Sequence, residues 1–254
     1  MVCRALKRSA TGVLAAACLA LGWVQGAQAV PTTILAMKLS DSTPATSDLD
    51  AFLGWRDAGG FNEGNAAAQF LIDNGLDYKN SIVDTNWASV LSVRVAMYRN
   101  GVEQKFIQFS PGTSKINFFT AANVTASSYT DLGDGGNFLS IAGDAGIDRH
   151  WFINNNYGGC GIDVGQWVVL DRRTTNYVCS WEENRDQVVG SADRGFLYAP
   201  GTQEANWNNA NVGIADVHAV FVTIDIAQVI PEPESYALIL AGLLVLGFAA
   251  RRRT

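Results

Sequence analysis

The chain has 254 residues, with 18 lysines and arginines against 24 aspartates and glutamates, so its formal net charge is −6 at neutral pH. Without residues 1–29 and 231–254, whose composition differs from the rest, 12 basic and 22 acidic residues remain, a net charge of −10. This acidity excludes binding to nucleic acid through a basic patch, and about 200 residues suit a single domain.

The N-terminal segment has the three parts of a secretory signal peptide. Three basic residues fall within the first eight positions, residues 10–24 are apolar, and Ala27 and Ala29 supply the small residues of a cleavage site. We therefore expect residues 1–29 to be removed. Cleavage before Cys18, in the manner of a lipoprotein, stays open as an alternative, although the usual leucine three residues earlier is missing.

The next part of the chain contains a clear hairpin signal. Residues 91–98 and 102–109 have the pattern of strands, and Asn100-Gly101 between them strongly favours a two-residue β-hairpin turn. The other elements predicted in this part are a strand at 34–39, short helices within 47–55 and 66–72, and a strand at 116–119.

The second half is a series of short β-rich runs separated by polar turns. The longest run, residues 217–226, predicts a central final strand. Many short strands with turn signals between them predict an antiparallel β-sandwich, jelly-roll-like, with one or two short helices. The other strands predicted here are 138–142, 150–153, 166–170, 177–181 and 196–198.

Two cysteines, Cys160 and Cys179, remain once the signal peptide is removed. In an exported protein they are predicted to form one disulfide, which closes a loop of about 20 residues and stabilises the fold by roughly 3 kcal/mol. A zinc site is not predicted, because it needs four suitable ligands and His150 and His218 lack the spacing. We therefore expect no metal site and no cofactor.

No arrangement of residues in the sequence predicts a catalytic site. Glu182-Glu183 is the best carboxylate pair, but in the strand expected there adjacent side chains point to opposite faces. The G-x-S-x-G motif of a serine hydrolase does not occur. His218 with Asp216 is the one dyad to retain, and we interpret it as structural. The chain is accordingly expected not to be an enzyme.

Residues 131–137 are rich in aspartate and glycine, a composition also found in calcium loops. They lack the EF-hand spacing and its downstream glutamate, although Asp144 and Asp148 add carboxylates close by. A turn is the simpler interpretation, because these residue types dominate turns. A structural Ca²⁺ in this loop stays open.

Tryptophans beside asparagines suggest sugar binding, since aromatic rings stack on sugar rings and amides bond to hydroxyl groups. Trp207 lies in a polar segment and is the tryptophan least easily explained by core packing. With Asn206 and Asn208, it is predicted to form a ligand-binding surface. The tryptophans expected in the core are Trp151, Trp167 and Trp181.

The C-terminal segment, residues 229–254, carries three signals in a fixed order. A Pro-Glu-Pro tripeptide cannot join a helix or a central strand, because proline lacks an N–H and fixes φ. An uncharged run, residues 237–250, and a basic tail follow. This order resembles the PEP-CTERM sorting signal of exported bacterial proteins. The resemblance is carried by Pro231, Glu232 and Pro233 in the spacer and by Arg251, Arg252 and Arg253 in the tail.

The resemblance implies export in a Gram-negative bacterium, a transient stay in the inner membrane, and recognition by a membrane-embedded exosortase. Cleavage near the tripeptide would then leave the protein at the cell surface or secreted. A permanent tail anchor is the alternative. The 14 residues from 237 to 250 span roughly 21 Å as a helix, short of the roughly 30 Å hydrocarbon core. An anchor also leaves the Pro-Glu-Pro tripeptide unexplained.

We therefore expect a non-catalytic exported protein of the cell surface or extracellular matrix, sorted by exosortase. We also expect it to bind extracellular polysaccharide, because the resemblance implies a host that produces such polymers. The alternative is a secreted glycan-active hydrolase, which requires two or more carboxylates converging with Trp207. The expected organisation is a signal peptide at 1–29, a β-sandwich domain at 30–228 and a sorting signal at 229–254.

Overall fold

The signal peptide and the sorting signal expected at the two ends lie outside the residues that the structure describes. The chain from Pro31 to Ile224 forms one compact unit. In the described part of the chain, no helix has the length and apolarity needed to cross a membrane. The computed structural model describes residues 31–44, 47–133, 137–144, 148–156, 160–171, 179–183, 194–208 and 212–225.

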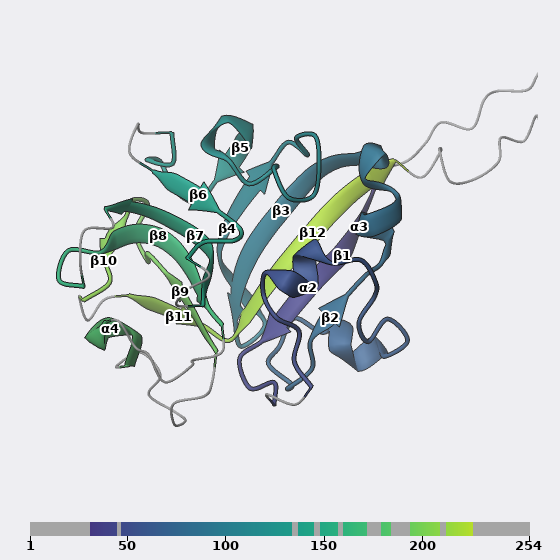
Figure 1. Cartoon of the computed structure of the whole chain (residues 1–254), viewed down its shortest axis with the longest axis horizontal. Coiled ribbons are helices and arrows are strands. Elements are labelled where there is room, and N and C mark those ends of the chain that lie inside the picture. The colour runs from purple at the N-terminus through teal and green to yellow at the C-terminus, as the bar shows by residue number, and fades with distance from the viewer. Residues whose placement is uncertain are drawn as a thin grey trace, which may run out of the picture. The chain divides into compact units, whose positions relative to one another are not determined.

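Two antiparallel sheets in a sandwich-like arrangement make up most of this unit (Figure 1), which confirms the predicted mainly-β sandwich. The first sheet has the order β2-β1-β12-β3-β4-β5, and the second has the order β11-β9-β8-β7-β6, with β10 paired to β8. The strands of the first sheet are β1 (Pro31–Ser40), β2 (Tyr78–Lys79), β3 (Val90–Arg99), β4 (Val102–Phe109), β5 (Val124–Ser127) and β12 (Val217–Asp225). Those of the second are β6 (Phe138–Ser140), β7 (Arg149–Asn156), β8 (Val164–Leu170), β9 (Gly195–Tyr198), β10 (Ala205–Asn206) and β11 (Gly213–Ala215).

The helical segments are single turns. The helix predicted within 47–55 is reduced to α2, and the one predicted within 66–72 is a 3-10 turn. The α-helices are α2 (Leu53–Arg56), α3 (Ile82–Thr85) and α4 (Ser180–Glu183), and the 3-10 turns are η2 (Ala66–Gln69), η3 (Trp87–Ser89) and η4 (Ala121–Asn123).

The hairpin of β3 and β4 forms where its turn sequence predicts it. Asn100 and Gly101 have φ angles of 51° and 75°, as a type I′ turn requires. Glycine reaches this region freely, and asparagine reaches it more easily than most residues. Val95 and Ile107 then pair across the two strands and are both fully buried. The hairpin prediction is confirmed.

The last strand, β12, lies inside the first sheet between β1 and β3 (Figure 1). It pairs with β3 along its length, from Val217 to Ile224. Residues 217–220 are consecutive and all buried, so both faces of the sheet are covered there. The predicted central final strand is therefore confirmed.

Strand β7 of the second sheet departs from regular geometry. Its register with β8 shifts between His150 and Ile153, and Trp151 has a φ of 46°, which a bulky residue rarely adopts. Trp151 is fully buried, and its Nε1 donates a 2.9 Å hydrogen bond to the carbonyl of Ala51. Packing and this hydrogen bond hold the irregular backbone in place, which sets the direction of the neighbouring His150.

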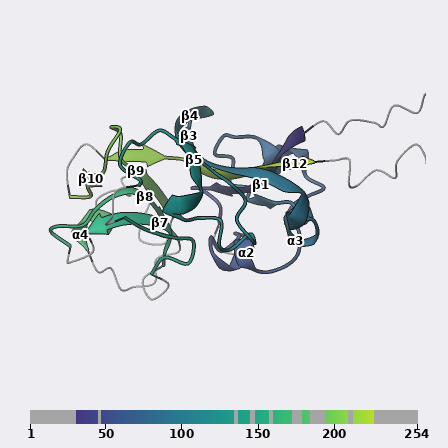
Figure 2. The same ribbon diagram turned by 90° about the horizontal axis from the view of Figure 1, so that it is seen from above.

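Figure 2 shows α2 against one face of the first sheet. Trp55 of α2 belongs to a cluster of aromatic side chains. The ring of Phe118 lies 5.4 Å from that of Phe109, 6.2 Å from that of Trp55 and 6.3 Å from that of Trp151. Residues 115–117 form a turn, and Phe118 and Phe119 follow it outside any strand, so the strand predicted at 116–119 is wrong. The apolar run there reflects the burial of a connecting segment, not strand pairing.

The return strand predicted at 177–181 is also wrong in its described part. Residues 180–183 form α4, with Cys179 directly before it, while residues 177 and 178 lie outside the described residues. The backbone N–H of Glu182 donates to the Cys179 carbonyl, which closes this turn locally instead of bonding to a neighbouring strand.

Candidate functional site

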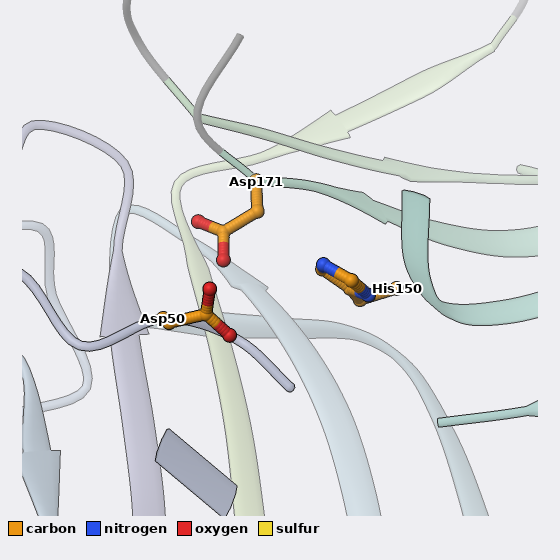
Figure 3. Close-up of side chains that lie close together, drawn as sticks. All are labelled: Asp50, His150 and Asp171. Atoms are coloured by element: carbon orange, nitrogen blue, oxygen red, sulfur yellow. The ribbon is translucent and has the colours of Figure 1, made fainter. Parts of the chain in front are cut away.

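Asp50, His150 and Asp171 come together from distant parts of the sequence (Figure 3). One ligand atom of each lies within 4.8 Å of those of the other two. Asp50 belongs to the loop between β1 and α2, His150 to β7, and Asp171 follows β8 directly. Figure 3 shows a ring nitrogen of His150 pointing toward the two carboxylates. Sequence reasoning missed this set, because no spacing motif links the three residues.

A backbone carbonyl sets the tautomer of His150. Its Nδ1 lies 2.8 Å from the carbonyl oxygen of Ala142. Since a carbonyl only accepts hydrogen bonds, Nδ1 carries the hydrogen of the neutral ring and Nε2 keeps its lone pair. The side chain is only 3% exposed. The ring of Phe52 stacks against the imidazole, with centroids 5.8 Å apart.

Backbone N–H groups hold both carboxylates. Asp50 Oδ1 accepts hydrogen bonds from the N–H groups of Phe52 and Leu53, at 2.9 and 2.5 Å, where α2 begins. Asp171 Oδ2 accepts from the N–H of Ala51 at 2.5 Å. Asp50 is exposed, whereas Asp171 is buried. Asp50 is thus the member of the cluster that reaches solvent.

Arg194 joins Asp171 to two further buried aspartates. Its guanidinium nitrogens lie 2.9 Å from Asp171, 2.6 Å from Asp77 and 3.4 Å from Asp48. Burial alone would lower the pKa of Arg194, but the charges of Asp77 and Asp171 outweigh it and raise that pKa. The arginine therefore stays protonated. Three aspartates thus share one arginine, and Asp50 lies near one of them, Asp171.

A second buried ion-pair network surrounds the predicted disulfide, which is present. The Cα atoms of Cys160 and Cys179 are 5.0 Å apart. Arg149 Nε donates a 2.6 Å hydrogen bond to Glu182, and its guanidinium lies over the Trp181 ring at 4.6 Å. Glu182 is thus a buried partner of an arginine, and it lies in α4 instead of in a strand.

Trp207 lies in the core, so the prediction of an exposed ring at this position is wrong. Its side chain is 0% exposed and stacks on Trp181, with centroids 5.9 Å apart. The amide groups of Asn206 and Asn208 donate to carbonyls in the loop that carries Cys160. The polar neighbours of Trp207 therefore form hydrogen bonds to a nearby loop, which explains why a buried tryptophan lies in a polar segment.

His218 and Asp216 do not form a dyad. His218 is fully buried beside Trp151, with centroids 5.1 Å apart, and neither ring nitrogen has a hydrogen-bond partner in the described part of the chain. Burial, with a smaller effect of the Arg194 charge, lowers the pKa of His218 from 6.5 to about 3. Asp216 instead accepts a 2.7 Å hydrogen bond from the N–H of Asn100. Each residue serves the packing or the turn around it.

The aspartate-rich loop is described only at its two ends. Asp131 Oδ2 accepts a 2.7 Å hydrogen bond from the N–H of Glu204, and the Asp131 carbonyl accepts one of 2.6 Å from Asn137. Residues 134–136 lie outside the described residues. The structural Ca²⁺ considered for this loop stays a prediction.

Comparison with known proteins bears on the C-terminus. Residues 229–253 match the family model described as the PEP-CTERM protein-sorting motif. No curated protein and no solved structure matches the chain. The motif implies export through a membrane-anchored intermediate, with exosortase as the processing partner. By residues 229–253, the chain is identified as one that carries a PEP-CTERM protein-sorting motif.

Proposed function

We propose that this chain is a non-catalytic protein of the cell surface or extracellular matrix, sorted by exosortase and associated with extracellular polysaccharide. The PEP-CTERM motif at residues 229–253 is the observation that carries the proposal. The β-rich unit from Pro31 to Ile224 precedes this motif, so it is the part that the motif delivers. An N-terminal signal peptide, residues 1–29, would start the export.

The buried carboxylates are paired with arginines, which supports a non-catalytic role. A glycoside hydrolase needs two carboxyl groups about 5–9.5 Å apart that both reach one sugar. Asp77 and Asp171 instead bind Arg194, and Glu182 binds Arg149, all in buried surroundings. Carboxylates paired with arginines in buried surroundings cannot approach a substrate.

Charge narrows the class of polysaccharide. Residues 30–230 carry a net charge of −10, so an anionic polymer would be repelled at low ionic strength. We therefore propose association with a neutral polysaccharide through exposed polar groups. Because Trp207 is buried, this association does not use its ring.

Replacement of the two prolines of the tripeptide tests the sorting. In the native host, the wild-type protein should reach the surface or medium with the intact mass of a chain lacking both ends. The double variant Pro231→Ala/Pro233→Ala should accumulate in the inner membrane with residues 234–254 attached. Pro200→Ala, an exposed proline outside the motif, should behave as the wild type. A wild-type protein that keeps residues 234–254 at its final location contradicts the proposal and favours a tail anchor.

Cosedimentation of the processed protein with purified host polysaccharide tests the binding. We expect retention on a neutral polymer that varies little between 20 and 500 mM salt, and none on an anionic polymer at low salt. Absence of retention on every host polymer contradicts the binding. Release of shorter glycan chains during the incubation favours the alternative, a secreted glycan-active hydrolase.

A further inference from the structure

We propose that Asp50, His150 and Asp171 bind a divalent transition-metal ion, and Zn²⁺ is the probe that best matches their chemistry. The three residues belong to the compact unit Pro31–Ile224, so the proposal does not depend on the sorting motif. A bound ion would cross-link the loop before α2 with β7 and with the end of β8. The role of the ion would be structural, because it would add to the hydrogen bond that already joins the loop before α2 to the end of β8.

The donor set favours a transition metal over calcium or magnesium. One imidazole nitrogen and two carboxylate groups are available within a space of 4.8 Å. Calcium and magnesium prefer oxygen ligands alone, whereas an imidazole nitrogen suits zinc and its neighbours in the first transition row. Three protein ligands and one water complete the four positions that zinc usually takes.

His150 is prepared for a ligand in a way that a merely packed histidine is not. Metal-binding histidines commonly donate the hydrogen of their other ring nitrogen to a carbonyl, which fixes the tautomer and the ring orientation. The carbonyl of Ala142 fills this role at 2.8 Å. The side chain is 3% exposed, and a ring nitrogen faces the carboxylates of Asp50 and Asp171 (Figure 3). With the hydrogen of the neutral ring on Nδ1, a buried imidazole that directs its lone pair at two carboxylates points to a cation between them.

Neighbouring groups also hold the two carboxylates in position. Arg194 holds one oxygen of Asp171 at 2.9 Å and the N–H of Ala51 holds the other at 2.5 Å. The N–H groups at the start of α2 hold Oδ1 of Asp50. Such contacts to ligands fix their direction and leave the remaining lone pairs for a metal ion.

The charge of the surrounding network favours a bound cation. Asp48, Asp77 and Asp171 contact Arg194, and Asp50 adds a fourth carboxylate. The charge of Lys38 also acts on Asp77, but its ammonium group is bonded to the Asn74 side chain and to two carbonyls. Negative charge near a buried site is costly unless it is paired, so a divalent ion beside Asp50 and Asp171 reduces the mutual repulsion.

A small closure of the site accompanies binding. Zinc lies about 2.0–2.2 Å from nitrogen and oxygen ligands, so tetrahedral ligand atoms are about 3.4 Å apart. The limit of 4.8 Å found here is wider, so at least one side chain moves inward. Asp50 is exposed, whereas His150 and Asp171 are buried, so Asp50 has the most room to move.

Calorimetric titration of the tag-free processed protein with ZnCl₂, after removal of metal with EDTA and dialysis, tests the proposal. We expect one Zn²⁺ per chain, and a rise in Tm of about 5–10 °C when Zn²⁺ is present at about 100 times its Kd. Ca²⁺ and Mg²⁺ at the same concentration should leave Tm unchanged. X-ray absorption of the zinc complex should show nitrogen and oxygen ligands, including an imidazole, and no sulfur.

The variant Asp50→Asn separates metal binding from folding. Asparagine keeps the side-chain oxygen that accepts from Phe52 and Leu53, so Tm without metal should stay as in the wild type. Its affinity for Zn²⁺ should fall at least tenfold, because a carboxylate ligand is lost. Asp57→Asn, at an exposed aspartate outside the cluster, should bind as the wild type. Equal affinity in Asp50→Asn, stabilisation by Ca²⁺ alone, or no stoichiometric binding of Zn²⁺ overturns the proposal.

Discussion

Replacement of His218 by leucine should remove a large part of the acid sensitivity of this fold. His218 is fully buried beside the ring of Trp151 and within the influence of the Arg194 charge. Its folded pKa is about 3, against 6.5 for the unfolded chain. Because the folded state holds the neutral ring, protonation favours unfolding. The contribution of the ring to stability is complete above pH 6.5 and is lost as the pH falls toward 3.

The size of this loss follows from the two pKa values. They differ by about 3.5 units, and each unit is worth about 1.4 kcal/mol, so the total is about 5 kcal/mol and is reached below pH 3. At pH 4 the loss is about 3 kcal/mol. Leucine has a similar volume and no titratable nitrogen, so His218→Leu should not lose this stability as the pH falls. At pH 7 the variant should be no less stable than the wild type, because it removes two buried nitrogens that lack hydrogen-bond partners in the described part of the chain.

Urea unfolding of the processed protein, followed by tryptophan fluorescence at pH 7, 6, 5 and 4, measures the effect. The quantity to compare is the difference in free energy of unfolding between His218→Leu and the wild type, because carboxylates titrate in both proteins and cancel. This difference should grow in favour of the variant by about 1.4 kcal/mol per pH unit below pH 6. Parallel curves for the two proteins would refute a neutral, buried imidazole at this position.

Three further perturbations test the buried networks and the turns. Arg194→Leu removes the guanidinium that three aspartates share, so it should lower the free energy of unfolding by about 3–5 kcal/mol in urea. Arg56→Leu, at an exposed ion pair, is the control and should leave the urea midpoint unchanged. Loss of the disulfide in Cys160→Ser/Cys179→Ser opens a loop with a sequence separation of 19 residues and should lower the stability by about 3 kcal/mol; an unchanged midpoint in the variant would contradict the stabilising role of the bond. Gly143→Ala places a methyl group onto a backbone carbonyl, at a φ of 58°, and should lower Tm by more than 5 °C in a thermal melt; an unchanged Tm would show that the turn can rearrange.

Local signals predicted the parts of the fold that depend on neighbouring residues. Asn100-Gly101 specified its hairpin because positive φ at two adjacent positions is a property of the residues themselves. The run at 217–226 predicted β12 because both faces of a central strand are buried, and the residues there are apolar or β-branched almost throughout. The disulfide between Cys160 and Cys179 followed from the export signal and the number of cysteines left.

Features that depend on contacts between distant residues could not be predicted in this way. The apolar run at 116–119 has a strand-like composition, but Phe118 packs against rings from three other segments instead. Trp207 was expected at the surface because its neighbours are polar, yet those neighbours bond to the disulfide loop and the ring is buried. The cluster around His150 joins residues separated by 100 and 21 positions, and only the tertiary structure brings them within reach.

The position of β12 sets the order in which the exported chain can fold. A polypeptide that leaves the cytoplasm N-terminus first presents β1 and β3 early, but these two strands do not bond to each other, because β12 lies between them. Until residues 217–225 emerge, each keeps an open edge, so the first sheet cannot close. In such N-terminus-first translocation, closure would wait until nearly the whole domain has crossed the membrane. The matched sorting motif begins at residue 229, four positions after β12 ends, so completion of the sheet and arrival of the motif are nearly simultaneous events in translocation.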